Sequence, residues 1–372
     1  MNSQLKILHI INNLAAGGAE KLILETLPLY RKEGVEVHLL LLNNRNPAFY
    51  DELLNTACCP VYVLGSRSVY NPLLIFRIIP YLRRFPLVHV HLFPALYWTA
   101  LAKMISFPKA KLCFTEHSTT NRRRSRPYFK MLDRMIYRQY ARIVTISPDV
   151  DDALRLYLGA GNDRIRLIPN GISLEKINSA EPYPATEFFP DHDARIIIQV
   201  SRFYVPKDQF TLIRAMSLLP AQVKLMLVGD GDLLPSCREL ATELGLEQRV
   251  HFTGIRMDVP RLLKTADIVV LSSKYEGLSL ACLEGMASGR PFVASDVPGI
   301  TGTVSGAGIL FPAGDAQALA GVIRDLLTDE KLYSDTVAAC RKRAAQYDIS
   351  VMAGKYIGLW KELFTEDAQK RR

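Results

Sequence analysis

Short runs of apolar residues alternate along the chain with longer segments in which apolar positions recur every three or four residues. The short runs predict buried strands, and the longer segments predict helices that pack on a sheet. Strands separated by helices imply a parallel sheet that is covered on both faces. In the first half of the chain, the predicted strands are 5–11, 35–42, 61–64, 88–93, 111–115, 142–146 and 165–168.

A second series of the same kind follows a break in the pattern. Residues 179–194 carry three prolines and no apolar periodicity, which is typical of a linker between domains. We therefore predict one domain over 1–178 and another over 195–348. The second domain is predicted to have strands at 196–200, 223–228, 250–252, 268–271 and 309–311, and to be helical over 315–346.

One segment of the second domain combines a strand, a tight loop and a helix with two carboxylates. Glu276 lies in the loop and Glu284 within the helix, with seven residues between them. A helix N-terminus offers unpaired N–H groups and a partial positive charge, and a glycine permits close approach of an anion. We expect the amides of Gly277, Leu278 and Ser279 to bind phosphate and the carboxylates to bind hydroxyl groups, as a nucleotide sugar requires. Two solvated glutamates at an ordinary helix start are the alternative.

Two cations follow the first strand of the second domain. Arg202 comes almost directly after that strand, and Lys207 comes five residues later, at the start of the next helix. The planar fork of Arg and the compact charge of Lys at the carboxyl end of a sheet suit a diphosphate. Two surface cations at a helix start are the alternative interpretation.

The sequence EGLSLACLEGMASGRP, residues 276–291, resembles the E-x7-E signature of the retaining glycosyltransferases of family 4. The resemblance implies an α/β chain with the GT-B fold, in which two Rossmann-like domains with parallel sheets face an interdomain cleft. It also implies that the first domain binds the acceptor and that the second binds the nucleotide sugar. The last helix, about 349–366, is then expected to pack back on the first domain.

Further motifs carry the resemblance along nearly the whole chain, and each implies a role. Arg202 and Lys207 resemble the R-x4-K segment of the family, which neutralises the leaving nucleoside diphosphate. Glu276 is expected to hold hydroxyl groups of the donor sugar, and Glu284 the ribose. His117, in TEHST, resembles a histidine that contacts the donor sugar or its phosphate.

Two glycine-containing loops complete the predicted donor site. Gly17 and Gly18, in GGAE, resemble the first loop of the family and are expected near the donor diphosphate or the acceptor; a tight strand-to-helix turn is an equally good interpretation. Thr253 and Gly254 resemble a loop that presents backbone atoms to the nucleobase. The family often has paired glycines and a Glu after the strand that follows E-x7-E, whereas residues 296–303 read DVPGITGT. This departure weakens the expectation that the loop supports the diphosphate.

Nucleotide sites of other kinds lack their motifs here. The first loop has no G-x-G-x-x-G, no acid follows the second predicted strand to hold an adenosine ribose, and the chain has no G-x-x-x-x-G-K-[ST]. His89 and His91 share a strand face, but no third ligand pattern accompanies them, so we predict no metal site. We expect no cofactor, with the nucleotide sugar as co-substrate.

The composition is typical of a folded cytoplasmic protein. The chain has 372 residues, 49% hydrophobic and 22% charged, which exceeds a usual single domain and does not indicate disorder. The six cysteines have neither disulfide nor metal spacing, and we expect reduced thiols. Hydropathy indicates no secretory signal and no spanning helix.

The formal net charge of +9 is unevenly distributed. Residues 119–142 contain eight basic residues and one acid, Asp133. Together with the apolar and basic stretch 73–85, this segment leads to the hypothesis of peripheral docking on the anionic inner face of the cell membrane. A solvated basic face without a partner is the alternative.

The sequence therefore predicts a cytoplasmic, metal-independent retaining hexosyltransferase. It would move a hexosyl or N-acetylhexosaminyl group from a nucleotide sugar to a saccharide, or to a polyprenyl-diphosphate-linked saccharide, in the synthesis of a surface polysaccharide such as lipopolysaccharide or capsule. A sugar-nucleotide epimerase or a glycogen-type synthase of the same fold remains an alternative. A non-catalytic polyanion-binding protein would explain the charge but not the Glu pair, and we predict no nucleic-acid partner.

Overall fold

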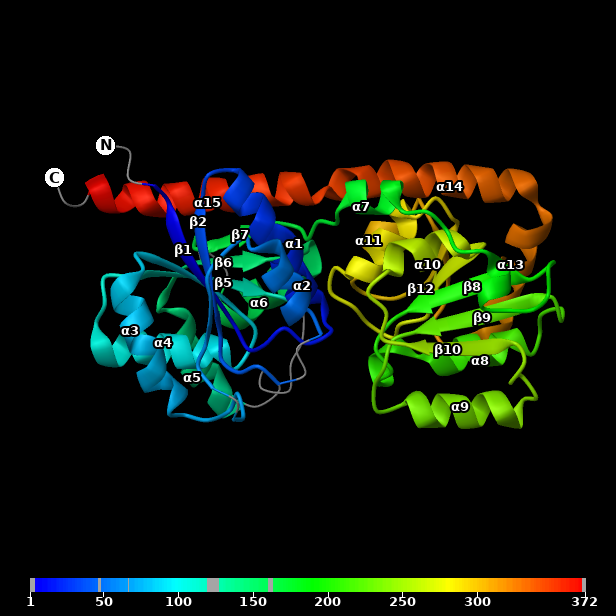
Figure 1. Cartoon of the computed structure of the whole chain (residues 1–372), viewed down its shortest axis with the longest axis horizontal. Coiled ribbons are helices and arrows are strands. Elements are labelled where there is room, and N and C mark those ends of the chain that lie inside the picture. Colours follow the sequence, from blue (N-terminus) through cyan, green and yellow to red (C-terminus); the bar gives the residue numbers. More distant parts are fainter. Residues whose placement is uncertain (1–3, 46–47, 66, 119–126, 160–162, 370–372) are drawn as a thin grey trace. The chain divides into compact units, whose positions relative to one another are not determined.

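The chain divides into two compact units, each built on one parallel sheet (Figure 1). The structure, a computed structural model, describes residues 4–45, 48–65, 67–118, 127–159 and 163–369. Unit 1 comprises Met1–Asn170 and Ile349–Arg372, and unit 2 comprises Gly171–Asp348. Among the described residues, no helix is both long enough and apolar enough to cross a membrane.

The sheet of unit 1 has the strand order β3-β2-β1-β4-β5-β6-β7, and every pairing is parallel. Its strands are β1 (Lys6–Ile11), β2 (Glu36–Leu41), β3 (Val61–Val63), β4 (Leu87–His91), β5 (Lys111–Glu116), β6 (Tyr140–Thr145) and β7 (Ile165–Leu167). Its helices are α1 (Gly18–Lys32), α2 (Tyr50–Thr56), α3 (Leu74–Arg84), α4 (Ala95–Ser106), α5 (Pro127–Tyr137), α6 (Pro148–Leu158) and α15 (Ile349–Gln369). All seven predicted strands are confirmed, with ends within two residues of the prediction.

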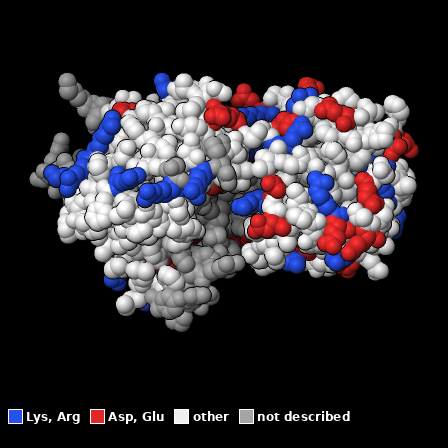
Figure 2. Space-filling model, turned by 60° about the horizontal axis from the view of Figure 1, so that its bottom comes forward, with Lys and Arg blue, Asp and Glu red and all other residues white. Residues whose placement is uncertain are grey.

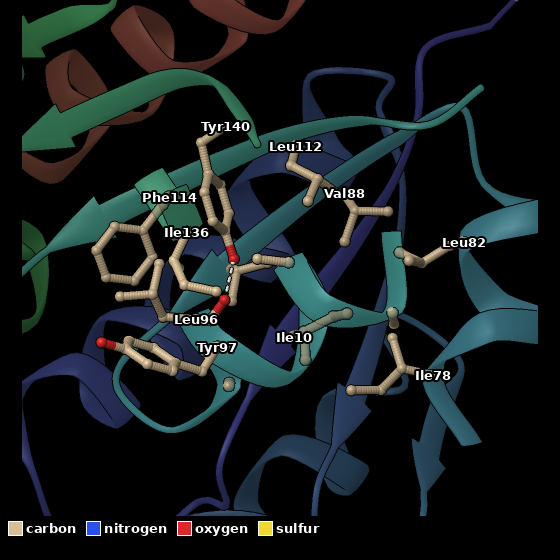
Figure 3. Close-up of a cluster of buried hydrophobic side chains, with 14 of the residues drawn as sticks. Ile10, Ile78, Leu82, Val88, Leu96, Tyr97, Leu112, Phe114, Ile136 and Tyr140 are labelled. Carbon is tan, nitrogen blue, oxygen red and sulfur yellow. Dashed lines mark hydrogen bonds between the residues drawn. The ribbon is translucent and has the colours of Figure 1, made fainter. Parts of the chain in front are cut away.

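Alternate residues of each strand face opposite sides of the sheet. On one side, strand residues such as Ile10 and Val88 pack against Ile78 of α3 and Leu96 of α4 in a continuous apolar core (Figure 3). The hydroxyl of Tyr140 donates to the carbonyl of Leu96 at 2.6 Å, so this buried polar group has a partner (Figure 3). The opposite side of β1 is covered by α1 and α15, which lie in contact with each other.

The sheet of unit 2 has the order β10-β9-β8-β11-β12-β13, again with every pairing parallel. Its strands are β8 (Arg195–Val200), β9 (Val223–Val228), β10 (Val250–Gly254), β11 (Ile268–Leu271), β12 (Phe292–Asp296) and β13 (Ile309–Pro312). Its α-helices are α7 (Leu174–Ser179), α8 (Gln209–Met216), α9 (Leu234–Glu243), α10 (Val259–Thr265), α11 (Leu280–Ala287), α12 (Thr301–Val304), α13 (Ala316–Thr328) and α14 (Glu330–Ala344). The five strands predicted here are present within the same margin.

The division of the chain differs from the predicted boundaries over residues 171–194. Residues 171–178 were assigned to the first domain, but they belong to unit 2 because α7 contacts α10 and α11. The predicted linker, 179–194, also packs on unit 2. There, the Tyr183 hydroxyl donates to Asp258 at 2.6 Å, and the Arg261 guanidinium lies 3.7 Å from the Tyr183 ring centroid.

The predicted helical region at 315–346 contains two helices, α13 and α14. Asp329 has an extended backbone that ends α13, and its carboxylate accepts a hydrogen bond from the amide of Leu332 at 2.9 Å. Asp329 is thus the N-cap of α14.

Candidate active site

In unit 2 the strand order reverses between β8 and β11. The chain passes from β8 to β9 on one side and from β11 to β12 on the other, so the loops after β8 and β11 diverge at the carboxyl edge of the sheet. Open α/β sheets bind ligands at such a point. Arg202 and Lys207 follow β8, and Glu276 and Gly277 follow β11. The fold therefore brings two separately predicted motifs to one edge.

Lys207 and Glu276 form an ion pair at this edge. The Lys207 ammonium contacts Oε1 of Glu276, and the Ser273 hydroxyl donates to the same oxygen at 2.7 Å. The two side chains are only 12% and 10% exposed, so salt and water screen the attraction weakly. Loss of one partner would leave a nearly buried charge unpaired, which typically costs about 3–5 kcal/mol.

A buried amide, Gln199, fixes both loops, and the sequence analysis did not identify it. Its Oε1 accepts hydrogen bonds from the backbone N–H of Ser272 at 3.1 Å and from the Ser272 hydroxyl at 2.8 Å. Its Nε2 donates to the carbonyl of Lys207 at 3.0 Å. Gln209 fixes the beginning of the loop after β8, because its Nε2 donates to the carbonyl of Arg202 at 2.9 Å. The only sequence signal for Gln199 is a polar residue within an apolar strand.

Helix α11 starts directly after the Glu276 loop. Ser279 is its N-cap residue, with an extended backbone, and Leu280 is its first residue. The predicted amide donors, 277–279, therefore lead into the positive end of the helix dipole, while Glu284 lies on the helix itself and is 6% exposed. Glu276 thus lies in the loop before the helix and Glu284 lies on the helix. Two carboxylates placed in this way are able to bind different parts of one ligand.

Two glycines hold the backbone that carries Arg202. Gly229 has φ +132°, and a Cβ there would lie 2.2 Å from the carbonyl oxygen of Ser201. Gly231 has φ +152°, and a Cβ there would lie 2.4 Å from the carbonyl oxygen of Phe203. Only glycine permits this approach of two backbones. The turn therefore serves to position the loop after β8.

The predicted base-binding loop lies beside this glycine turn. The amide of Gly229 donates to the carbonyl of Gly254 at 2.8 Å, and the Thr253 hydroxyl donates to the same carbonyl at 3.0 Å. Arg202 itself is exposed, and its guanidinium lies 5.7 Å from the centroid of the Tyr204 ring. Backbone groups and one cation are therefore available at this edge.

A further loop supports Glu276 from behind. The amide of Glu276 donates to the carbonyl of Pro298 at 3.3 Å, and Gly299, with φ +85°, is packed so closely that a Cβ would lie 2.0 Å from the carbonyl oxygen of Glu276. These residues belong to the segment in which the sequence departs from the family pattern. The segment thus holds the backbone of the Glu276 loop, which the sequence analysis did not foresee.

The remaining predicted site residues lie in unit 1, where the strand order reverses between β1 and β4. Gly17 is the N-cap of α1, in extended backbone, and Gly18 is the first residue of that helix. The Asn12 side chain fixes the loop after β1, because its Nδ2 donates to the carbonyl of Phe93 at 2.8 Å. His117 follows β5 and is half-buried, and desolvation lowers its pKa to about 4.

His117 is joined to a cluster of buried histidines. The two histidines of β4, His89 and His91, lie beside His9 of β1, and one ring nitrogen from each of the three lies within 4.8 Å of the others. Burial lowers the pKa of His9 to about 3 and that of His89 and His91 well below the ordinary value. The sequence analysis found no third histidine because His9 is close only through the pairing of β1 with β4.

Two protein families match the chain, one over its first half and one over its second half. Residues 16–176 match Glycosyltransferase Family 4, and residues 186–343 match Glycosyl transferases group 1. EpsF of Bacillus subtilis (strain 168), which is named as a glycosyltransferase, is 29% identical over 316 residues, or 79% of this chain and 80% of EpsF. An N,N'-diacetylbacillosaminyl-diphospho-undecaprenol alpha-1,3-N-acetylgalactosaminyltransferase of Campylobacter jejuni is 32% identical over 167 residues, or 44% of each chain.

Solved structures have the same fold. The crystal structure of Anabaena HepE in complex with UDP-glucose has a TM-score of 0.84 at 23% identity and covers 98% of this chain and 100% of that one. The sucrose-phosphate synthase of Thermosynechococcus elongatus has a TM-score of 0.82 at 23% identity, with coverage of 98% and 100%. The predicted GT-B fold is thereby confirmed.

We expect Gly299→Ala to displace the loop that carries Glu276. Alanine is strained at φ +85°, and its Cβ would clash with the Glu276 carbonyl, so the free energy of unfolding should fall by more than about 1 kcal/mol. Hydrogen exchange at 274–279 should accelerate, as measured by mass spectrometry. Gly302→Ala is the matched control, because a Cβ there meets no atom within 4 Å. Equal exchange in both variants would mean that the loop does not depend on Gly299.

Proposed function

Because both halves of the chain match glycosyltransferase families and the fold is GT-B, we propose that the chain transfers a hexosyl or N-acetylhexosaminyl group from a nucleotide sugar to a saccharide or a lipid-linked saccharide. The observation that carries this proposal is the convergence of Arg202, Lys207, Glu276 and the N-terminus of α11 at the strand reversal of unit 2. Cations, amides and a carboxylate there match the diphosphate and the hydroxyl groups of such a donor.

In this proposal each group acts on one part of the donor. Arg202, Lys207 and the amides of 277–279 bind the diphosphate. Glu276 accepts hydrogen bonds from hydroxyl groups of the sugar, and Glu284 from the ribose. An ammonium group has three N–H donors, so Lys207 is able to keep Glu276 in place while it binds a phosphate oxygen. The ion pair therefore orients the carboxylate before the donor arrives.

The proposed reaction places its main electrostatic demand on the leaving group. The bond between the anomeric carbon and the diphosphate oxygen breaks, and negative charge develops on the diphosphate. Arg202, Lys207 and the helix N-terminus stabilise that charge, and this contribution of fixed cations is the reason that we propose a metal-independent reaction. The acceptor oxygen bonds to the anomeric carbon on the face that the diphosphate leaves, and its proton passes to a diphosphate oxygen, so the configuration is retained.

The acceptor is proposed to bind unit 1 through the loop around Gly17 and Gly18, while His117 is proposed to contact the donor sugar or its phosphate. A relative is named as acting on a diphospho-undecaprenol-linked sugar, and two others as lipopolysaccharide core biosynthesis glycosyltransferases, both from Rhizobium meliloti. These names support a lipid-linked or polysaccharide acceptor and a role in surface polysaccharide synthesis. We propose that the protein is cytoplasmic and acts at the inner face of the membrane, where it would reach such an acceptor.

Exposed apolar and basic side chains of unit 1 support docking on an anionic bilayer. Helices α3, α4 and α5 pack together, and apolar side chains point outward from them or from the turns at their ends: Tyr70, Leu73, Phe76, Ile105, Phe107 and Met131. Arg83, Lys130 and Arg134 are exposed on the same helices. Figure 2 shows Lys and Arg among wide uncharged areas of unit 1, with few acids, whereas acids and bases are mixed on unit 2. Exposed cations bind anionic lipid headgroups, and exposed apolar side chains enter the acyl boundary. Residues 119–126, which contain four of the eight basic residues of the run at 119–142, lie outside the described residues.

We expect donor binding to be detectable without acceptor. Thermal-shift assays against UDP-, GDP-, ADP- and TDP-sugars, with and without EDTA, should give stabilisation by one base that survives EDTA. Stabilisation that EDTA abolishes would contradict metal independence. Salt-dependent retention of the protein on DNA, without any sugar-nucleotide binding, would favour a polyanion-binding protein instead. Conversion of the sugar nucleotide to its epimer in the absence of acceptor would indicate an epimerase.

Substitutions should separate donor affinity from turnover. Glu284→Ala should weaken donor binding, because it removes the partner of the ribose. Arg202→Ala should mainly lower turnover, by roughly 10²-fold or more, as removal of a group that stabilises developing charge does, and Lys207→Ala should do the same. Arg214→Ala, on the exposed side of α8, is the matched control and should behave as wild type. Wild-type turnover in all three site variants would refute the assignment.

Retention is tested separately on the product. The NMR spectrum of the new glycosidic linkage should have the same anomeric configuration as the donor sugar. An inverted linkage would contradict the proposed departure and attack on one face, while it would leave the assignment as a glycosyltransferase intact.

Membrane docking should depend on the apolar surface of unit 1. Wild-type protein should cosediment with anionic phosphatidylglycerol vesicles at low salt, and the double variant Leu73→Ser and Phe76→Ser should cosediment less. Both side chains are exposed, at 57% and 59%, so the fold should tolerate the change. Leu156→Ser on α6, where the side chain is 85% exposed, is the control. Wild-type protein that stays entirely in the supernatant would contradict docking.

A further inference from the structure

Three histidines form a continuous line of hydrogen bonds across the sheet of unit 1. Nδ1 of His9 lies 3.3 Å from Nε2 of His91, and Nδ1 of His91 lies 3.5 Å from Nε2 of His117. The three residues come from β1, from β4 and from the end of β5, which are neighbours in that order in the sheet. The line therefore runs from the covered core to the carboxyl edge, where His117 is half-buried.

The environment keeps all three rings neutral near pH 7. His9 and His91 are 1% and 6% exposed, and desolvation lowers the pKa of each well below the ordinary value, as it does for His117. A neutral imidazole has one N–H donor and one acceptor nitrogen. Each link of the line therefore needs a donor on one ring and an acceptor on the next.

We propose that His91 and His9 are positioning residues that tie the tautomer of His117 to their own. In one arrangement His9 and His91 both donate from Nδ1, so Nε2 of His117 accepts and its Nδ1 carries the proton. In the other arrangement His117 and His91 both donate from Nε2, and Nε2 of His9 carries the last proton. The three rings thus always share one tautomer, all Nδ1–H or all Nε2–H.

The consequence concerns the remaining nitrogen of His117, Nδ1, which is outside the line. In the all-Nδ1–H arrangement it donates to a phosphate or sugar oxygen, and in the all-Nε2–H arrangement it accepts from a hydroxyl group. A ring without His91 is free to exchange between both forms, so part of the molecules would present the wrong atom. The tautomer relation rests on the geometry of unit 1, while its use toward a sugar or phosphate rests on the proposed function.

A second line of hydrogen bonds contains His89 and does not reach His117. Nε2 of His89 lies 2.8 Å from the hydroxyl of Thr115, which lies 3.1 Å from the hydroxyl of Tyr356 on α15. His89 is as buried as His9 and lies on the same strand face as His91, but its hydrogen bond does not lead to His117. It is therefore the matched control for a substitution of His91.

The proximity of His9, His89 and His91 also raises the question of a metal site. A metal ligand must direct a free lone pair at the ion, whereas both ring nitrogens of His91 are engaged with neighbouring histidines. The group found among the described residues contains no carboxylate, so a divalent ion would bring two uncompensated positive charges into an apolar core. The hydrogen-bonded line accounts for the geometry without this cost.

The test is the tautomer of each ring in full-length protein labelled with ¹⁵N-histidine, treated with EDTA and observed by long-range ¹H–¹⁵N correlation at neutral pH. Single substitutions assign the signals. We expect His9, His91 and His117 of the wild type to have the same single tautomer. In His91→Phe, the two ¹⁵N shifts of His117 should move toward each other as the ring averages between tautomers, and in His89→Phe they should stay unchanged.

The proposal is overturned by opposite or averaged tautomers in the wild type, or by equal effects of His91→Phe and His89→Phe on His117. If His91→Phe fails to fold, His9→Phe removes only the far end of the line and leaves the hydrogen bond between His91 and His117, so these two rings should still share one tautomer. Stoichiometric binding of added Zn²⁺ or Co²⁺ that His89→Phe abolishes would also overturn it in favour of a metal site. Donor thermal shifts on the same samples report the proposed function independently, since loss of donor binding would leave the tautomer result standing.

Discussion

Two crossovers leave the sheet of unit 2 in opposite directions at β8 and β11. The loops after these two strands therefore lie at the carboxyl edge of the sheet, beside each other. Everything proposed for the donor site depends on this divergence. It places a cationic loop and a carboxylate loop side by side, and it orients the N-terminus of α11 toward the same edge. Close backbone approach then becomes the second requirement, which Gly229, Gly231 and Gly299 meet because no side chain fits at these positions.

The ion pair of Lys207 and Glu276 depends on its buried position at this edge. In water such a pair contributes little, but here both side chains are largely buried, and Gln199 and Ser273 hold the loop and the carboxylate in place. Desolvation of the two charges cancels most of their attraction, so the pair adds little net stability. Its contribution is that it holds the two groups in a fixed geometry. A site with ready-oriented charges needs less rearrangement when charge develops on a leaving diphosphate.

The sequence was sufficient for those features that repeat along it or that stand as compact motifs. Apolar runs located every predicted strand, and the spacing of Glu276 and Glu284 located the loop and helix of the donor edge. Residues whose role depends on a neighbouring strand were missed: Gln199 is a single polar residue in an apolar strand, and His9 meets His91 only because β1 pairs with β4. The sequence analysis also did not locate the point at which the helical region 315–346 divides, where Asp329 ends α13 and caps α14.

The two units place polar groups at their carboxyl edges by opposite means. Unit 2 uses charges on loops, whereas unit 1 carries neutral imidazoles into the interior of its sheet. Neutrality has a cost in acid: an unfolded histidine binds a proton below a pKa of about 6.5, while His9 and His117 in the folded chain bind one only below about 3 and about 4. Between these values the unfolded state binds more protons, so unit 1 loses stability as the pH falls below about 6.5. Near neutral pH this linkage vanishes, and the imidazoles are free to act through the position of a proton rather than through charge.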